Sequence, residues 1–235
     1  MKKGFFAFVT AVVVAFVTAL ALCVQALNAP KEVFSLAGQG MKIVVDAGHG
    51  GIDGGVTGIT TGVKESHLNL KIALKLKEVL SDMGFEVTLT RKTEGGLYGT
   101  PSSGFKRRDM EKRKEIIERA KPSLIVSVHQ NRYPAQSVRG GQVFYRVDDK
   151  DSELLGLAVQ EQMNALYAKQ GVKARKAVAG EYYMLSCYDA PSMIVECGFL
   201  SSPLDEKLLL EESFQRQIAS RVATGVLTYL SNLTS

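Results

Sequence analysis

Short apolar runs separated by segments of helical periodicity are the strongest constraint on the fold. Such runs occupy residues 41–46, 124–128 and 193–195, and they are rich in Val, Ile and Met. Runs of this length are typical of buried strands. Residues 65–83 instead place apolar side chains at helical spacing, and Gly84 follows as a helix-ending residue. Strands alternating with helices predict an α/β fold: a single domain with a mostly parallel central sheet flanked by helices on both faces.

The remaining elements fit the same pattern. We expect strands at residues 85–90 and 142–145, a charged helix that ends near Lys121, a helix at 152–170, and one or two helices at the C-terminus.

The N-terminal segment predicts export or anchoring. Residues 4–27 carry no charge and follow Lys2 and Lys3, and about 20 apolar residues suffice to cross a bilayer. Val24-Gln25-Ala26 offers a cleavage site, so a cleaved signal peptide and an uncleaved membrane anchor both remain open. With the two lysines inside, everything after Pro30 is expected outside the cytoplasm, either membrane-anchored or secreted.

Charge and cysteine content are less informative. The formal net charge of +5 suits an anionic envelope polymer but is also ordinary for an enzyme. The basic stretch at residues 106–114 contains interleaved acids, which favours a solvated helix face, and we expect no nucleic-acid partner. Cys187 and Cys197 fit no metal-knuckle or disulfide-framework spacing. We interpret them as small core residues and leave their pairing open.

Four residues whose side chains can bind a metal ion or transfer a proton lie at or near the ends of these elements. His49 and His129 follow predicted strands, Glu196 ends one, and Glu65 opens a helix. Because ligands gather at the carboxyl ends of parallel strands, we expect the four side chains to converge. Two imidazoles and one carboxylate are a typical catalytic set for one Zn²⁺ ion. Glu196 leaves an apolar strand, so its carboxyl pKa should be raised toward the working pH, as suits a general base.

Weaker candidates surround this set. Asp46 is a candidate supporting acceptor, and Asn131 and the backbone amides of Gly50 and Gly51 are candidate donors to a substrate or to loop carbonyls. Each residue also has an ordinary interpretation: a lone histidine is more often packed or exposed than ligating, and Glu65 could be only a favourable acid at a helix start. The glycine-rich loop at 48–55 fits neither the P-loop nor the dinucleotide pattern.

Five segments together resemble the zinc-dependent N-acetylmuramoyl-L-alanine amidases of the Amidase_3 type. They are residues 43–55 (IVVDAGHGGIDGG), 64–65 (KE), 90–91 (TR), 127–131 (SVHQN) and 194–201 (IVECGFLS), in family order. The resemblance runs from about residue 41 to residue 230.

The resemblance implies that His49, Glu65 and His129 bind zinc and that Glu196 is the catalytic carboxylate. The implied reaction is hydrolysis of the amide between N-acetylmuramic acid and L-alanine in peptidoglycan. It also matches Arg91 to the family's strand-ending arginine, which we place with Asp46 and Asn131 as substrate-binding or supporting residues.

Other matches and departures concern the surroundings of the site. Arg113 matches a helix arginine that we interpret as structural. Glu118 and Ser202 stand where the family often has asparagine. Neither is a proposed ligand, so these differences bear on the packing of loops more than on activity.

The domain layout narrows the subtype. We expect a signal peptide or anchor at 1–30, a linker at 31–40 and the zinc amidase domain at 41–235. One catalytic domain directly behind a membrane segment is similar to the sporulation members of the family, which act on spore cortex in muramic-δ-lactam formation and germination. This implies work in the intermembrane space of the developing spore, with an accessory or activating protein as a reasonable partner. A zinc peptidase cutting within the stem peptide and a catalytically silent wall-binding module are the alternatives.

Overall fold

The structure is a computed structural model that describes residues 40–233. The predicted leader, and all of the predicted linker except Gly40, lie outside the described residues. Between residues 40 and 233, no helix has both the length and the apolar character needed to span a bilayer.

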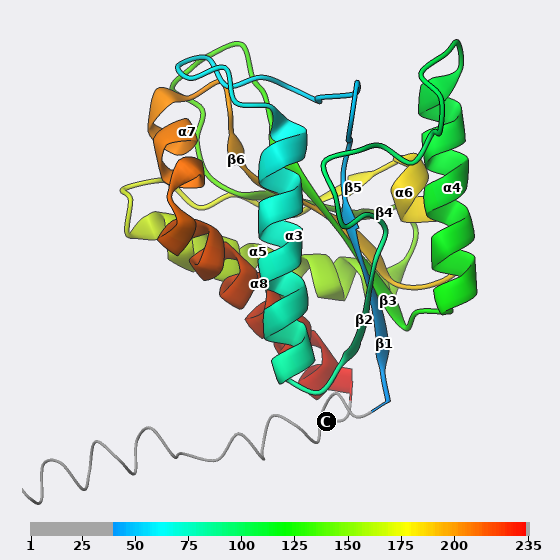
Figure 1. Ribbon diagram of the computed structural model, residues 1–235. Coiled ribbons are helices and arrows are strands. Elements are labelled where there is room, and N and C mark those ends of the chain that lie inside the picture. The colour runs from blue at the N-terminus through cyan, green and yellow to red at the C-terminus, as the bar shows by residue number, and fades with distance from the viewer. Residues whose placement is uncertain (1–39, 234–235) are drawn as a thin grey trace, which may run out of the picture.

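A six-stranded sheet forms the centre of the domain, in the order β2-β1-β3-β6-β4-β5 (Figure 1). The four strands β2, β1, β3 and β6 are parallel, β4 pairs antiparallel with β6, and β5 runs parallel to β4. The predicted mostly parallel sheet is therefore confirmed. The strands are β1 (Lys42–Ala47), β2 (Glu86–Leu89), β3 (Leu124–Asn131), β4 (Gln142–Arg146), β5 (Val178–Gly180) and β6 (Ser192–Phe199).

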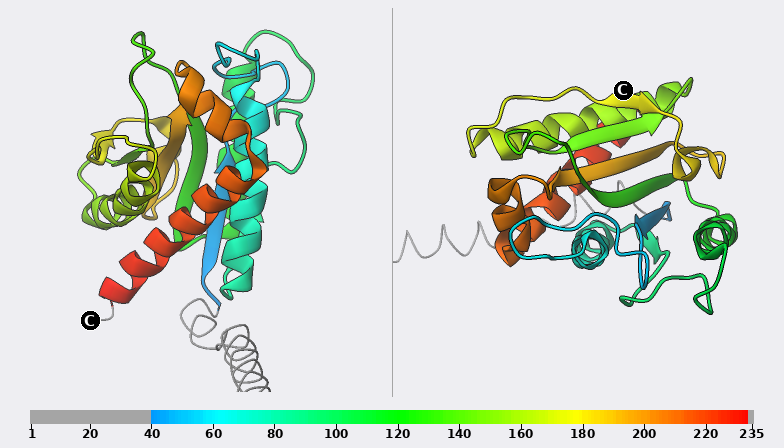
Figure 2. Two further views of the ribbon diagram at one scale, coloured as in Figure 1. Left: turned by 90° about the vertical axis from the view of Figure 1, so that its left-hand side faces the viewer. Right: turned by 90° about the horizontal axis from the view of Figure 1, so that it is seen from above.

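Helices cover both faces of the sheet, as expected (Figure 2). The described helices are α3 (Glu65–Asp82), α4 (Phe105–Ala120), α5 (Lys150–Ala168), α6 (Tyr183–Ser186), α7 (Pro203–Leu210) and α8 (Glu212–Leu233). The main core lies between one face and helices α3, α5 and α8. The opposite face, under α4 and α6, has a much smaller core of Val44, Ile117, Ile125 and Met184.

The strand order creates a crevice at the top of β1 and β3. The chain leaves β1 through α3 to reach β2, then returns through α4 to β3 on the other side of β1. Right-handed crossovers in opposite directions must use opposite faces of the sheet, so α3 and α4 diverge. The carboxyl ends of β1 and β3 therefore form a topological switch point, where open α/β sheets bind their ligands.

Two sequence expectations need correction. His129 lies within β3, which continues to Asn131, and Glu196 lies within β6, which continues to Phe199. The apolar runs end earlier than the strands because parallel pairing continues past them, with His129 opposite Glu196 in register. The three-residue β5 and four-residue α6 were not predicted because such short elements carry no periodic signal.

Cysteine pairing is also resolved by the structure. Cys187 and Cys197 are both free thiols. Cys197 is buried, as the core interpretation expected, whereas Cys187 is only half-buried.

Two leucines of α3 give a matched test of the main core. Leu76 is 0% exposed and Leu74 is 36% exposed. Leu76→Ala should lower the free energy of unfolding by about 2–5 kcal/mol, because it leaves a cavity in a close-packed core. Leu74→Ala should change it by less than about 1 kcal/mol. Urea unfolding followed by circular dichroism measures both, and equal losses would contradict the placement of α3.

Candidate active site

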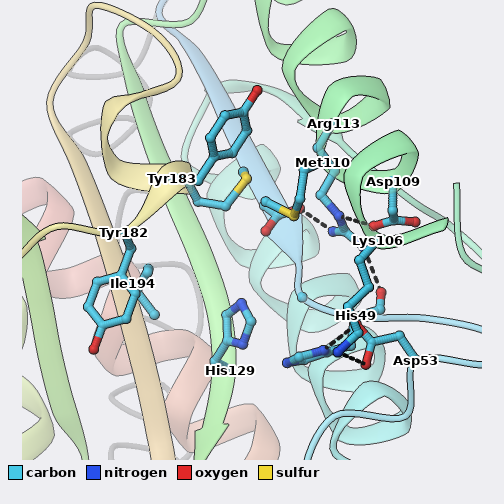
Figure 3. Close-up of a pocket in the computed structure, with 13 residues that line it drawn as sticks. His49, Asp53, Lys106, Asp109, Met110, Arg113, His129, Tyr182, Tyr183 and Ile194 are labelled. Atoms are coloured by element: carbon cyan, nitrogen blue, oxygen red, sulfur yellow. Dashed lines mark hydrogen bonds and ion pairs between the residues drawn. The ribbon is translucent and has the colours of Figure 1, made fainter. Parts of the chain in front are cut away.

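Three predicted ligands converge at the switch point. The ligand atoms of His49, Glu65 and His129 all lie within 4.8 Å of one another. Glu65 Oε1 is 2.9 Å from His129 Nδ1 and 3.3 Å from His49 Nε2. The two imidazole rings meet edge to face with centroids 5.0 Å apart (Figure 3). Residues separated by as many as 80 positions in the sequence thus form one compact group of donors.

Asp53 fixes the orientation of the His49 ring. Its Oδ2 lies 3.0 Å from His49 Nδ1, so the other ring nitrogen, Nε2, turns toward Glu65. A carboxylate on the second nitrogen of a ligating histidine sets both its tautomer and its ring angle. Sequence reasoning missed Asp53; its only signal was an acid four residues after His49 in the glycine-rich loop.

The carboxylate of Glu65 is buried, and both of its oxygens accept hydrogen bonds. Its Oε2 accepts a hydrogen bond from the Val56 amide, and Oε1 accepts from the Gln130 amide and from Asn69 Nδ2. Burial alone would raise the pKa of Glu65, but His129 and His49 hold it well below its usual range. Glu65 is therefore an anion at the first turn of α3, where the helix dipole also favours negative charge.

Two glycines allow the ligands to approach this closely. A Cβ at Gly48 would lie 2.2 Å from the His129 ring, and a Cβ at Gly55 would lie 2.3 Å from Glu65 Oε2. Gly55 also has a φ of +67°, in the left-handed region that glycine favours. The glycine-rich loop serves the donor cluster by leaving room for it.

Arg91 and Arg113 hold the backbone that presents His49. Arg91 donates to the carbonyls of Ala47 and Gly48, while Arg113 donates to those of Ala47 and His49. His49 itself has a φ of 60°, which is unusual for a non-glycine residue. Three successive carbonyls anchored by two buried guanidinium groups keep His49 in this conformation.

Asp46 neutralises this buried positive charge. It forms an ion pair with Arg113 and accepts hydrogen bonds from the Thr90 and Ser127 hydroxyls. Burial alone would raise the pKa of Asp46, but Arg113 and the two hydroxyls outweigh it and lower the pKa to about 2. Arg113 also pairs with Asp109, which accepts from the Leu97 amide and was missed because α4 reads as a solvated charged helix.

Asn131 and the loop amides have local partners in this structure. Asn131 Oδ1 accepts from the Arg132 amide at the end of β3. The Gly50 amide donates to the Asp53 carbonyl, and the Gly51 amide donates to the Glu94 carbonyl. The two glycine amides therefore bond loop carbonyls, one of the two uses expected for them.

Glu196 stands beside the donor cluster in an unusual electrostatic state. It pairs in register with His129, and its buried Oε2 has no hydrogen-bond partner among residues 40–233. Burial raises the pKa of Glu196 to about 7, with a further rise from Glu65 and opposing effects of His129 and His49. A carboxyl with a pKa near neutrality can both take and return a proton at working pH.

These residues fit a divalent cation. Two imidazoles and one anionic carboxylate are the donor chemistry of catalytic zinc sites, which leave one coordination position open. The unsatisfied Glu196 Oε2 is the kind of buried polar atom that calls for an additional partner. Burial alone would lower the pKa of His49, but Glu65 and Asp53 raise it to about 9, so positive charge is favoured at this point.

Comparisons with known proteins agree with this geometry. The sequence profile of the N-acetylmuramoyl-L-alanine amidases (Amidase_3) matches residues 43–228. The chain belongs to this family. It is 30% identical over 201 residues to the germination-specific N-acetylmuramoyl-L-alanine amidase of Bacillus subtilis strain 168, covering 84% of this chain and 83% of that protein.

Solved structures share the fold. The structure of the CwlD amidase from Clostridioides difficile, in complex with the GerS lipoprotein, is 34% identical with a TM-score of 0.77; the match covers 82% of this chain and 99% of that chain. The catalytic domain of CwlV from Bacillus (Paenibacillus) polymyxa var. colistinus is 26% identical with a TM-score of 0.69, over 81% and 98% of the two chains. The protein is thus an enzyme with N-acetylmuramoyl-L-alanine amidase activity on peptidoglycan.

The Asp46–Arg113 pair should contribute to the acid sensitivity of the amidase. Asp46→Asn should lower the free energy of unfolding by about 3 kcal/mol at neutral pH, because Arg113 loses a buried partner. The folded pKa of Asp46, about 2, lies below the unfolded value of about 3.9. The carboxylate therefore stabilises the fold above about pH 4, and this contribution is lost as the pH falls toward about 2.

Urea unfolding of both proteins across this pH range measures the effect. The difference between wild type and Asp46→Asn should shrink as the pH falls. Glu111→Gln, which breaks an exposed pair with Arg107 on the same helix, should cost less than about 1 kcal/mol. A difference independent of pH would contradict the assignment.

Proposed function

We propose that this amidase is zinc-dependent and uses one Zn²⁺ ion held by His49 Nε2, Glu65 and His129 Nδ1. The observation that carries the proposal is the convergence of these three donors within 4.8 Å. Zinc held by such a set acts as a Lewis acid, which polarises an amide carbonyl and acidifies water. The ion would replace the direct contacts that now join the two imidazoles to Glu65.

Glu196 is the proposed catalytic residue. Its carboxylate takes a proton from the attacking water and passes it to the nitrogen of L-alanine as the amide bond breaks. Its pKa of about 7 suits both steps. The products are a muramoyl lactyl carboxylate and a stem peptide with a free L-alanine amino group.

The supporting residues have distinct proposed roles. Asp46 and Arg91 position the His49 loop through the contacts described above and do not touch the substrate. Asp53 orients the His49 ring, and Asn131, half-exposed at the end of β3, is a candidate substrate donor.

We also propose a role in the spore cortex. The support is the similarity to a germination-specific amidase and to CwlD. Residues 41–235 would form the catalytic domain behind a leader at 1–30 and a linker at 31–40, working outside the cytoplasm in the intermembrane space of the developing spore, where removal of stem peptides precedes muramic-δ-lactam formation. The GerS lipoprotein bound to CwlD supports an accessory protein as partner.

Product analysis of digested peptidoglycan tests the reaction and the role of Glu196. Metal-replete enzyme should release intact stem peptides and leave unsubstituted muramic acid, as detected by mass spectrometry, with cortex peptidoglycan preferred over vegetative wall. Glu196→Gln should retain zinc but lose at least about a hundredfold in rate, because it cannot move the proton.

Controls separate the components of this proposal. His129→Ala should lose both metal and turnover, whereas Glu118→Gln, on the exposed face of α4, should match wild type. Cleavage within the stem peptide would instead support the zinc peptidase, and binding of the wall without any product would support a silent module.

Zinc binding should displace protons from the site. With the pKa of His49 raised to about 9, the imidazole must lose a proton before it can ligate. The apparent zinc affinity should therefore rise with pH, by up to about tenfold per unit below about pH 9. Calorimetry in buffers of different ionisation enthalpy measures this release. Zinc binding with no proton release between about pH 6 and about pH 9 would contradict the ligand role of His49.

A further inference from the structure

A cavity of about 290 Å³ adjoins the donor cluster on the face of the sheet covered by α4 and α6. His49 and His129 lie at one end of it, Met110 of α4 forms one wall, and Tyr182 and Tyr183 stand across from that wall (Figure 3). Its volume is about ten times that of a water molecule in the liquid, which is room for one substituted ring. It lies on the face of the sheet that has the smaller core.

The ring of Tyr182 is fixed in place although much of it is exposed. A Cβ at Gly180 would lie 2.6 Å from this ring, so the ring packs directly on the Gly180 backbone. Phe144 contacts it edge to face, with centroids 5.3 Å apart. Tyr182 nevertheless remains 47% exposed. A ring held from behind by a glycine, with a large free surface, is a preorganised stacking platform.

The charged side chains that line the cavity are already paired. Arg113 pairs with Asp46 and Asp109, and Lys106 lies 3.7 Å from Asp53. A charged peptide would have to compete with these pairs for its partners. An uncharged ring with apolar C–H faces, by contrast, matches the apolar and aromatic surface provided by Met110, Ile194 and Tyr182.

We propose that this cavity binds the muramoyl sugar ring on the glycan side of the scissile amide, with Tyr182 stacked on the ring. The inference rests on the proposed function, because the sugar and the peptide must lie on opposite sides of the amide held at the zinc site. Tyr182 is then a specificity-determining residue that selects a glycan-borne substrate over a free acylated peptide.

Two substrates that differ only in the sugar test the proposal. One is a disaccharide carrying the stem peptide, and the other is the same peptide carrying a lactoyl group alone. Tyr182→Ala should raise KM for the first about tenfold and leave the second nearly unchanged. Tyr182→Phe should behave as wild type, and Gly180→Ala, which displaces the ring, should reproduce the selective loss. Leu157→Ala, an equally exposed apolar position on α5 (46%), is the matched control.

A binding measurement separates this proposal from the proposed function. In the Glu196→Gln background, a peptide-free disaccharide containing N-acetylmuramic acid should perturb tyrosine resonances in NMR titrations, and Tyr182→Ala should weaken its binding about tenfold. If the wild-type enzyme hydrolysed neither substrate, the proposed function would fail. The titration would still show whether the cavity binds the sugar, because it measures binding and not turnover. Equal disaccharide binding by both proteins, or a KM loss as large on the lactoyl peptide, would overturn the proposal.

Discussion

The structure depends on two buried arginines that hold one turn of backbone. Arg91 and Arg113 together bind the carbonyls of three successive residues, 47–49, which are the last residue of β1 and the two that follow it. Carbonyls at the end of a buried strand would otherwise lack partners, which costs about 1–3 kcal/mol each. Asp46 balances the charge, so the network is satisfied in both hydrogen bonding and electrostatics. His49 can therefore occupy a left-handed conformation and present Nε2 to the other two ligands.

The loop between His49 and Glu65 is stabilised from the far end of the chain. Glu206 of α7 accepts hydrogen bonds from the amides of Thr60 and Thr61, and the Ile59 amide donates to the Leu200 carbonyl. Glu206 is fully buried. The segment between His49 and Glu65 is thus anchored to the residue that directly follows the strand carrying Glu196 and to helix α7, so distant parts of the chain help to hold this loop.

The sequence predicted the convergence of His49, Glu65 and His129 better than it predicted what surrounds them. Long apolar runs and helical spacing identified β1, β3, α3 and α8 because burial leaves a periodic pattern. The roles of Asp53, Asn69 and Asp109 were not predicted. The sequence does not distinguish a polar residue that faces water from one that faces a buried partner. The extents of β3 and β6 were underestimated for a related reason: backbone pairing continues through His129 and Glu196, whatever their side chains.

By itself, the sequence determined the α/β class, the order of the elements and the identities of the four chemical groups, since residue type and period are local properties of the chain. Only the tertiary structure decided which nitrogen of each histidine faces the cluster, which charges are neutralised, and where an apolar cavity remains beside the site. These features depend on distances between segments that are far apart in the chain. The topological switch point at β1 and β3 sets those distances.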